Sequence, residues 1–167
     1  MERIIGALVA IALAILAVGN TLSNSGQAKS DQKSGGAATD IGYVMTKARA
    51  GFAQSNNGYA NFTNANLSGL INGGTFPPTM VKGAGIFDKW GNPITLSSAN
   101  SGTSGVISFG GGGSQTVDEC TSTVTSMSGY DLMTVGGGGN FTRNSMPDTS
   151  QAGAVCSSTA TIVVTFH

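Results

Sequence analysis

Cys120 and Cys156 are the residues of this 167-residue chain for which the sequence leaves the fewest possible chemical roles. Two thiols can share a metal or form a disulfide, but a tetrahedral metal site needs further ligands. His167 is the only histidine, so a metal site is disfavoured. Because the N-terminus has features of an export signal, the even number of cysteines predicts a disulfide. We expect it to join a helix that begins near Val117 to the segment entering the last strand, stabilising the fold by about 3–4 kcal/mol.

The remaining candidate groups do not make a catalytic constellation. Asp118 and Glu119 are adjacent, so they point in different directions on a helix, and the first turn of a helix suits them better. The glycine runs Gly110–Gly113 and Gly136–Gly139 fit neither common phosphate-binding pattern, and we interpret them as flexible turns. The prediction is a protein that is not an enzyme and that uses no cofactor and no metal.

The composition argues against a nucleic-acid partner. Charged residues make up 10% of the chain, against about 25% in ordinary soluble domains. Eight basic and eight acidic residues cancel, which leaves no electrostatic attraction for a polyanion. Polarity comes instead from Ser, Thr, Asn and 26 Gly. Such a surface suits an extracellular or assembled protein, whose subunits approach one another without repulsion.

The most apolar stretch is residues 4–18, preceded by Met1, Glu2 and Arg3. Fifteen helical residues span about 22 Å, whereas the hydrocarbon core of a bilayer is about 30 Å thick. The stretch therefore predicts a signal peptide, a marginal membrane anchor or a helix that packs against copies of itself, and we interpret it as a marginal anchor. Its large apolar side chains, expected to form a filament-core helix, are Ile4, Ile5, Leu8, Val9, Ile11, Leu13, Ile15, Leu16 and Val18.

A polar, glycine-containing segment follows and divides the chain into an N-terminal part, residues 1–27, and a head domain, residues 28–167. Because each glycine costs a helix about 1 kcal/mol relative to alanine, the segment Gly19–Gly36 predicts stretched or melted chain, with Gly19 and Gly26 as the expected break. Helical periodicity returns with Ile41, and Thr39 or Asp40 is the expected N-cap. The apolar positions of this helix are Ile41, Val44, Met45, Ala48 and Phe52.

Strand and helix signals alternate in the rest of the chain. A short helical turn is expected at Leu67–Ile71, a helix with its apolar face at Val117, Cys120, Val124 and Met127, and a C-terminal strand at Ala160–Phe166 that is almost wholly β-branched. Further strands are expected around Ile94–Leu96, Val106–Phe109 and Leu132–Val135. This order predicts an α+β fold in which a long N-terminal helix packs on an antiparallel or mixed sheet, with a disulfide-closed C-terminal region.

Three features carry a resemblance to a known family. They are the apolar helix that continues into Ile41-Gly42-Tyr43-Val44-Met45, the turn and strand Trp90-Gly91-Asn92-Pro93-Ile94-Thr95-Leu96, and the segment Cys120-Thr121-Ser122-Thr123-Val124 with a late Cys156 before a C-terminal strand. In this order they resemble mature type IV pilins of the b subclass, similar to bundle-forming, toxin-coregulated and conjugative thin-pilus pilins. The resemblance covers essentially the whole chain.

The resemblance implies a filament subunit, the major pilin of an extracellular pilus that serves conjugation, adhesion or aggregation. It implies a leader removed by a prepilin peptidase, often with methylation of the new N-terminus, storage in the inner membrane of a Gram-negative bacterium, and helical assembly with identical subunits by the pilus machinery. Two alternatives remain open: a minor pilin or pseudopilin of a secretion or uptake system, and a secreted binding domain that retains its signal peptide.

The N-terminus departs from the family pattern at one position. Type IV pilins usually carry Glu at position 5, where it pairs with a neighbour's terminal amine, whereas this chain has Ile5. Glu2 is the only acid in the stretch. The hypothesis is that Glu2 or the Met1 amine joins a charge pair between subunits; the alternative is that Glu2 and Arg3 lie at the membrane interface.

Overall fold

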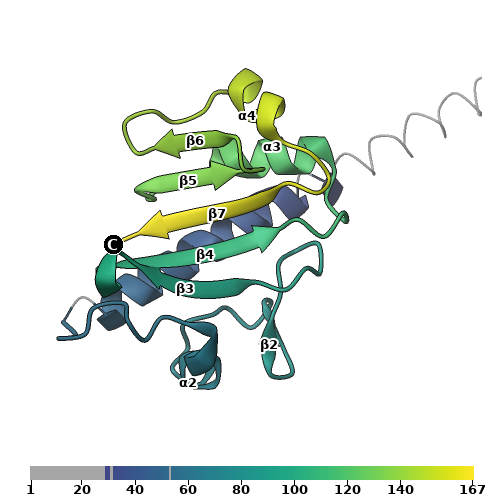
Figure 1. Cartoon of the computed structure of the whole chain (residues 1–167). Helices are drawn as coiled ribbons and strands as arrows, with labels where there is room; N and C mark the ends of the chain where they lie inside the picture. Colours follow the sequence, from purple (N-terminus) through teal and green to yellow (C-terminus); the bar gives the residue numbers. More distant parts are fainter. Residues whose placement is uncertain (1–28, 31, 53) are drawn as a thin grey trace, which may run out of the picture. The chain divides into compact units, whose positions relative to one another are not determined.

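A five-stranded antiparallel sheet lies across one long helix (Figure 1). The structure is a computed structural model that describes residues 29–30, 32–52 and 54–167. Lys33–His167 forms a compact unit, which contains the hydrophobic core. The N-terminal segment 1–27, with its predicted anchor, the residues Met1 to Arg3 and the expected break at Gly19 and Gly26, lies outside the described residues.

The N-terminal helix covers residues 32–52, and residues 29 and 30 are also helical. The predicted apolar stripe is confirmed, because Ile41, Val44, Met45 and Ala48 are all at most 1% exposed. Thr39 and Asp40 do not cap the helix; they lie inside it. The Thr39 hydroxyl donates to the Gly35 carbonyl, and the Asp40 carboxylate pairs with Lys89 at 2.7 Å.

The prediction of irregular chain as far as Gly36 is wrong for the described residues before Ile41. Tertiary contacts offset the weak helix propensity of Gly35 and Gly36. Ser34 is buried, and its carbonyl accepts a hydrogen bond from the Thr123 hydroxyl. The Lys89 side chain lies across the helix at Gly36, where an added Cβ would come within 3.1 Å of its Cε. Contacts with residues distant in sequence therefore lengthen the helix.

The sheet has the order β3-β4-β7-β5-β6, and every neighbouring pair is antiparallel. The mixed sheet left open by the sequence is thus excluded. The C-terminal strand β7 lies at the centre, paired with β4 on one side and β5 on the other. Its residues Ile162, Val164 and Phe166 are fully buried against the helix side, as a period of two requires. The strands are β3 (Thr95–Ala99), β4 (Ser104–Gly110), β5 (Leu132–Val135), β6 (Gly139–Thr142) and β7 (Thr161–Phe166).

Shorter elements surround the sheet. Those before β3 are η1 (Asn64–Asn66), α2 (Leu67–Asn72) and the two-stranded β1 (Val81–Lys82) with β2 (Gly85–Ile86). Later elements are η2 (Asn100–Gly102), α3 (Val117–Ser126) and α4 (Thr149–Val155). The sequence did not predict β1, β2, β6 and α4. Strand β6 begins Gly-Asn, two residues that strands disfavour, and α4 is only seven residues long.

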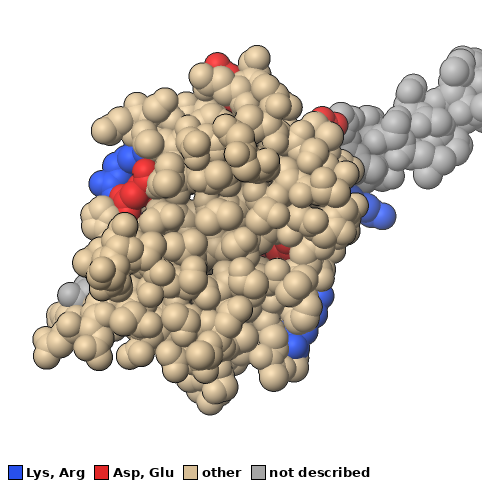
Figure 2. Space-filling model, in the orientation of Figure 1, with Lys and Arg blue, Asp and Glu red and all other residues tan. Residues whose placement is uncertain are grey.

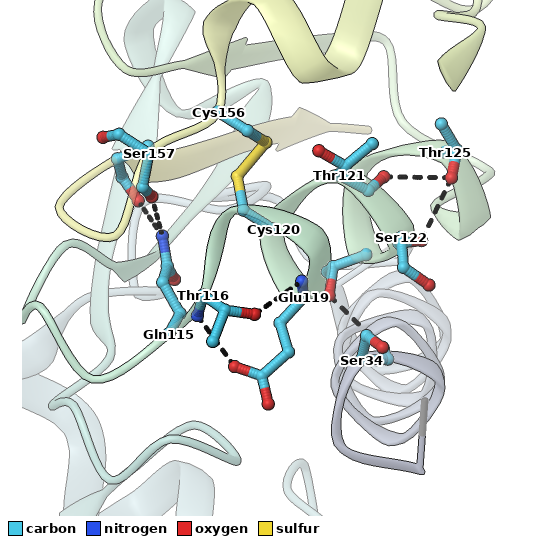
Figure 3. The surroundings of a disulfide bond; sticks show 12 residues. Ser34, Gln115, Thr116, Glu119, Cys120, Thr121, Ser122, Thr125, Cys156 and Ser157 are labelled. Carbon is cyan, nitrogen blue, oxygen red and sulfur yellow. Dashed lines mark hydrogen bonds between the residues drawn. A yellow bond between two sulfur atoms is a disulfide. The ribbon is translucent and has the colours of Figure 1, made fainter. Parts of the chain in front are cut away.

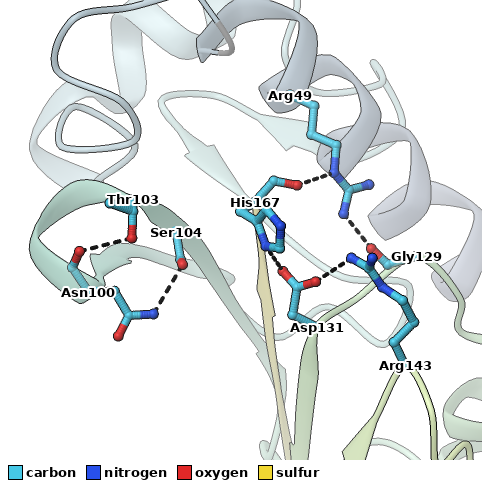
Figure 4. Close-up of polar contacts among 8 residues, drawn as sticks. All are labelled: Arg49, Asn100, Thr103, Ser104, Gly129, Asp131, Arg143 and His167. Carbon is cyan, nitrogen blue, oxygen red and sulfur yellow. Dashed lines mark hydrogen bonds and ion pairs between the residues drawn. The ribbon is translucent and has the colours of Figure 1, made fainter.

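An aromatic cluster closes one end of the core, where the N-terminal helix ends. The Phe166 ring contacts Tyr59 and Phe62 edge-on, with centroids 5.4 and 5.6 Å apart. The Arg49 guanidinium lies 5.4 Å from the centroid of the Phe166 ring. Arg49 Nε also donates to the His167 carbonyl at 2.7 Å, and Nη2 donates to the Gly129 carbonyl (Figure 4). The Arg49 side chain thus ties the end of the helix to the sheet.

We predict that Arg49→Gln lowers the free energy of unfolding by about 1–3 kcal/mol, because two carbonyls lose a charged donor. Urea unfolding monitored by circular dichroism measures the change. Lys47→Gln is the matched control, since Lys47 is exposed and lies over the Tyr43 ring, and it should cost less than about 1 kcal/mol. Equal effects of the two variants would show that the link from Arg49 to the sheet contributes nothing.

Candidate functional site

The predicted disulfide is confirmed: Cys120 on α3 is bonded to Cys156, which follows α4 (Figure 3). Cys120 is fully buried. The bond closes a region that contains α3, β5, β6 and α4 and leads directly to the central strand β7. The bridge therefore holds α3 and α4 together at the entrance to the strand on which the sheet is built.

A capping box fixes the start of α3. The Thr116 hydroxyl accepts from the Glu119 amide at 3.1 Å, and Glu119 Oε2 accepts from the Thr116 amide at 2.8 Å. Asp118 and Glu119 thus lie in the first turn of the helix, as predicted, where they stabilise its positive end. Cys120, Val124 and Met127 are buried as predicted. Val117 is not, because it is the first residue of the helix, and it remains 46% exposed.

Two polar side chains attach the disulfide-closed region to its surroundings. Gln115 is buried, and its Nε2 donates to the carbonyls of Ser157 at 3.1 Å and Ala160 at 2.7 Å. Thr123 donates to the Ser34 carbonyl on the N-terminal helix.

The start of α4 has a second capping box, made by Asp148 and Gln151. The signal Asp-x-x-Gln before α4 was present in the sequence and could have revealed this helix.

The glycine runs are turns, as predicted, and the first of them is held by an aspartate that the sequence did not single out. The buried Asp88 carboxylate accepts from the amides of Trp90, Asn92 and Gly110 at 2.8 to 2.9 Å. Gly112 has no room for a side chain, since an added Cβ would lie 1.9 Å from Asn92 Oδ1. Gly136 and Gly137 turn the chain between β5 and β6 with positive φ angles of 59° and 75°. These runs serve packing and chain reversal.

Titratable groups gather at one end of the sheet. Asp131 pairs with Arg143 and with His167 Nδ1, the latter at 2.5 Å (Figure 4). The Arg143 and His167 side chains are more than half exposed, so these pairs contribute little. Burial raises the pKa of the Tyr59 and Tyr130 hydroxyls, and for Tyr59 the nearby Arg49 charge partly opposes this rise. Both phenols therefore stay protonated at neutral pH. Within the described residues no three His, Cys, Asp or Glu side chains form a potential metal site.

The exposed side of the N-terminal helix forms a smooth face, defined here as Gly35, Thr39, Gly42, Tyr43 and Thr46. The hydroxyls of Thr39 and Thr46 donate to the carbonyls of Gly35 and Gly42, at 2.8 and 2.9 Å. Neither hydroxyl therefore needs an outside partner to donate to. Apart from the chain neighbours and the helix's own nearby backbone, no described atom lies within 4 Å of a Cβ added at Gly35 or Gly42. The five residues of the smooth face carry no charge themselves, although Lys47 Nζ lies 5.5 Å from the centroid of the Tyr43 ring.

No helix of the described part of the chain has the length and apolarity needed to cross a membrane. The predicted anchor at residues 4–18 is not among the described residues, so this finding does not concern it. The predicted assembly residues Met1, Glu2 and Arg3 likewise lie outside the described part.

The long helix, the antiparallel sheet and the disulfide-closed C-terminal region define a protein with the type IVb pilin fold. The crystal structure of a type IVb pilin from Salmonella typhi superposes with a TM-score of 0.57, at 21% identity, covering 77% of this chain and 98% of that one. Residues 31–167 match the family described as PilS N terminal. The chain belongs to this family of type IV pilins, which are structural subunits of extracellular pilus filaments and not enzymes. A comparison with curated protein sequences gives no significant match.

We predict that replacing both cysteines, Cys120→Ser with Cys156→Ser, lowers the free energy of unfolding by about 3 kcal/mol, because the unfolded chain regains the entropy of the opened loop. Urea unfolding under non-reducing conditions measures it. Wild-type protein in a thiol reductant should unfold like the double variant. An unchanged unfolding midpoint would show that packing alone holds α3 and α4.

Proposed function

We propose that this chain is the major subunit of a type IVb pilus. The apolar residues 4–18 pack with their copies in the filament core, and the head domain forms the outer wall. The observation that carries the proposal is the smooth face of the N-terminal helix, where every residue except Tyr43 is small and uncharged.

The two glycines of this face are costly to the isolated head domain. A glycine inside a helix destabilises it by about 1 kcal/mol relative to alanine. Nothing in the described part of the head domain requires Gly35 or Gly42, because a methyl group there would meet no described atom within 4 Å outside the adjoining backbone of the helix. Small residues on a helix surface allow another helix to approach closely. We therefore assign these glycines to contact between subunits.

The outer face of the sheet also favours dense packing of subunits. Figure 2 shows this face of the head domain with almost no charged side chain over the strands and charges mainly at its edges. The alternating residues that leave the core on β4 and β7 are Val106, Ser108, Thr161, Val163 and Thr165. Neighbouring heads with zero net charge experience little repulsion at the short distances found within a filament.

The proposed cycle is physical rather than chemical. The short apolar helix is stored in the inner membrane and then transferred into a bundle of identical helices. The transfer replaces lipid contacts with protein packing, so its net hydrophobic cost is small. A prepilin peptidase and the pilus assembly machinery are the expected partners, and the finished filament serves conjugation, adhesion or aggregation outside the cell.

We predict that Gly42→Ala stabilises the monomer yet impairs assembly. The alanine should raise the free energy of unfolding by up to about 1 kcal/mol, while its methyl group obstructs a neighbouring helix. Thermal unfolding of detergent-solubilised chain and the yield of sheared filaments, seen by electron microscopy, measure the two effects.

Gly69→Ala is the matched control for this variant. Gly69 lies in α2, and an added Cβ there also meets open space. It should stabilise the chain without reducing the filament yield. Normal filament yield with Gly42→Ala would contradict the assignment of the smooth face. Abundant filaments of this single chain support a major pilin, whereas a purely monomeric product would favour a secreted binding domain and scarce incorporation a minor pilin or pseudopilin.

We also propose that Glu2 or the Met1 amine forms a charge pair between subunits, because Ile5 stands where the family usually has Glu. Glu2→Ala should then reduce filament yield severely, whereas Glu2→Asp, which keeps the charge, should retain much of it. Quantifying sheared filaments from equal cell mass decides the matter. Full yield from Glu2→Ala would leave Glu2 as an interfacial residue only.

A further inference from the structure

An open cleft of about 370 Å³ lies at the end of the head domain where the N-terminal helix ends. Two segments form it: the loop that follows the helix and the turn η2 between β3 and β4. Its volume falls within the range of small-molecule sites, about 300–1,000 Å³. The residues that line the cleft are Asn56, Asn57, Gly58, Ala60, Ser101, Gly102 and Thr103.

The two walls of the cleft are fixed to each other. The Tyr59 amide donates to the Gly102 carbonyl at 2.6 Å. A Cβ at Gly58, whose φ is +51°, would lie 2.5 Å from the same oxygen, so this close approach requires glycine. The Tyr59 ring is buried against Phe62 and Phe166 and anchors the loop to the core. The cleft is thus preorganised, which lowers the entropy cost of binding.

The turn η2 holds a serine in an unfavourable conformation beside the cleft. Asn100 and Ser101 have φ angles of 52° and 56°, in the left-handed region that favours glycine. Asn100 is held by two hydrogen bonds. Its side-chain Nδ2 donates to the Ser104 hydroxyl at 3.1 Å, and its backbone carbonyl accepts from the Thr103 hydroxyl. Ser101 is exposed and has no such support in the described part of the chain. Strained residues of this kind collect at ligand sites, and Ser101 is among the residues that line the cleft.

The lining defines the chemistry of a ligand. It contains amides, hydroxyls, backbone groups and the Ala60 methyl group, and no charged side chain. The side chains of Asn56, Asn57 and Ser101 are exposed and form no hydrogen bond to the described residues. An amide offers a donor and an acceptor side by side, which matches the neighbouring hydroxyls of a sugar ring. A charged ligand would find no counter-charge in this lining.

We propose that this cleft binds a short uncharged saccharide. The proposal goes beyond filament assembly and does not depend on it, because all the lining residues belong to one chain. The same uncharged lining could instead accept a loop of a neighbouring subunit, and the experiment separates the two.

The test uses the full chain in detergent micelles, with chitotriose, maltotriose and lactose as probes in saturation-transfer difference NMR. At least one probe should bind, with a Kd on the order of 1 mM. Asn57→Ala should weaken binding about fivefold to tenfold, and Ala60→Phe, which fills the cleft, should abolish it. Asn144→Ala is the matched control, because Asn144 is an exposed amide outside the cleft, and it should bind like the wild type.

Thermal unfolding of each variant shows whether the fold is retained, and Ser101→Gly provides a second variant that relieves strain while removing the hydroxyl. It should unfold at a higher temperature and bind more weakly. Absence of transfer to all three saccharides, or transfer that persists in Ala60→Phe, overturns the proposal. If none of the saccharides binds and Ala60→Phe reduces filament yield, the cleft is a subunit contact. If Gly42→Ala loses filaments but still binds saccharide, the saccharide site and the subunit contact on the smooth face are independent of each other.

Discussion

The head domain depends on one contact, the packing of the N-terminal helix against the inner side of β7 and its neighbours. Ile41, Val44 and Met45 on the helix and Ile162, Val164 and Phe166 on the strand are all at most 1% exposed. Because β7 is the last strand in sequence and the central one in the sheet, the sheet is completed only when the end of the chain is inserted. Arg49 strengthens the junction by binding the His167 carbonyl and lying over Phe166.

This arrangement explains why the disulfide lies where it does. The chain between Cys120 and Cys156 makes a long excursion through β5, β6 and α4 before it returns to β7. The disulfide joins the two ends of this segment, which keeps β5 and β7 close enough to pair. It also reduces the conformational entropy of a glycine-rich segment in the unfolded chain. The capping boxes of α3 and α4 fix the two short helices that carry the bridge. Local and covalent constraints act on the same region.

The helix that organises the core has a second, exposed side, to which we assign the contact between subunits. One side of the helix is buried in the head, while the other offers Gly35, Thr39, Gly42 and Thr46. A filament subunit must satisfy both its own core and its neighbours with one helix. In the proposed filament, the small uncharged residues on the exposed side would meet this demand at some cost in monomer stability. The sparsely charged sheet face and the amide-lined cleft extend the same surface chemistry to the outside of the head.

The sequence by itself determined which segments bury a face. The period of 3.6 from Ile41 to Phe52 predicted the helix side, the β-branched run to Phe166 predicted β7, and the cysteine count predicted the disulfide, because these patterns are local consequences of burial. Only the tertiary structure decided that the described residues before Ile41 are helical, since Lys89 and Thr123 support helical residues around Gly36 that propensity disfavours. It also decided that the sheet is wholly antiparallel, that Gly139–Thr142 becomes a strand beside β5, and that Asp88 holds the first glycine run. Each of these rests on partners distant in sequence, whose contact energy no local pattern contains.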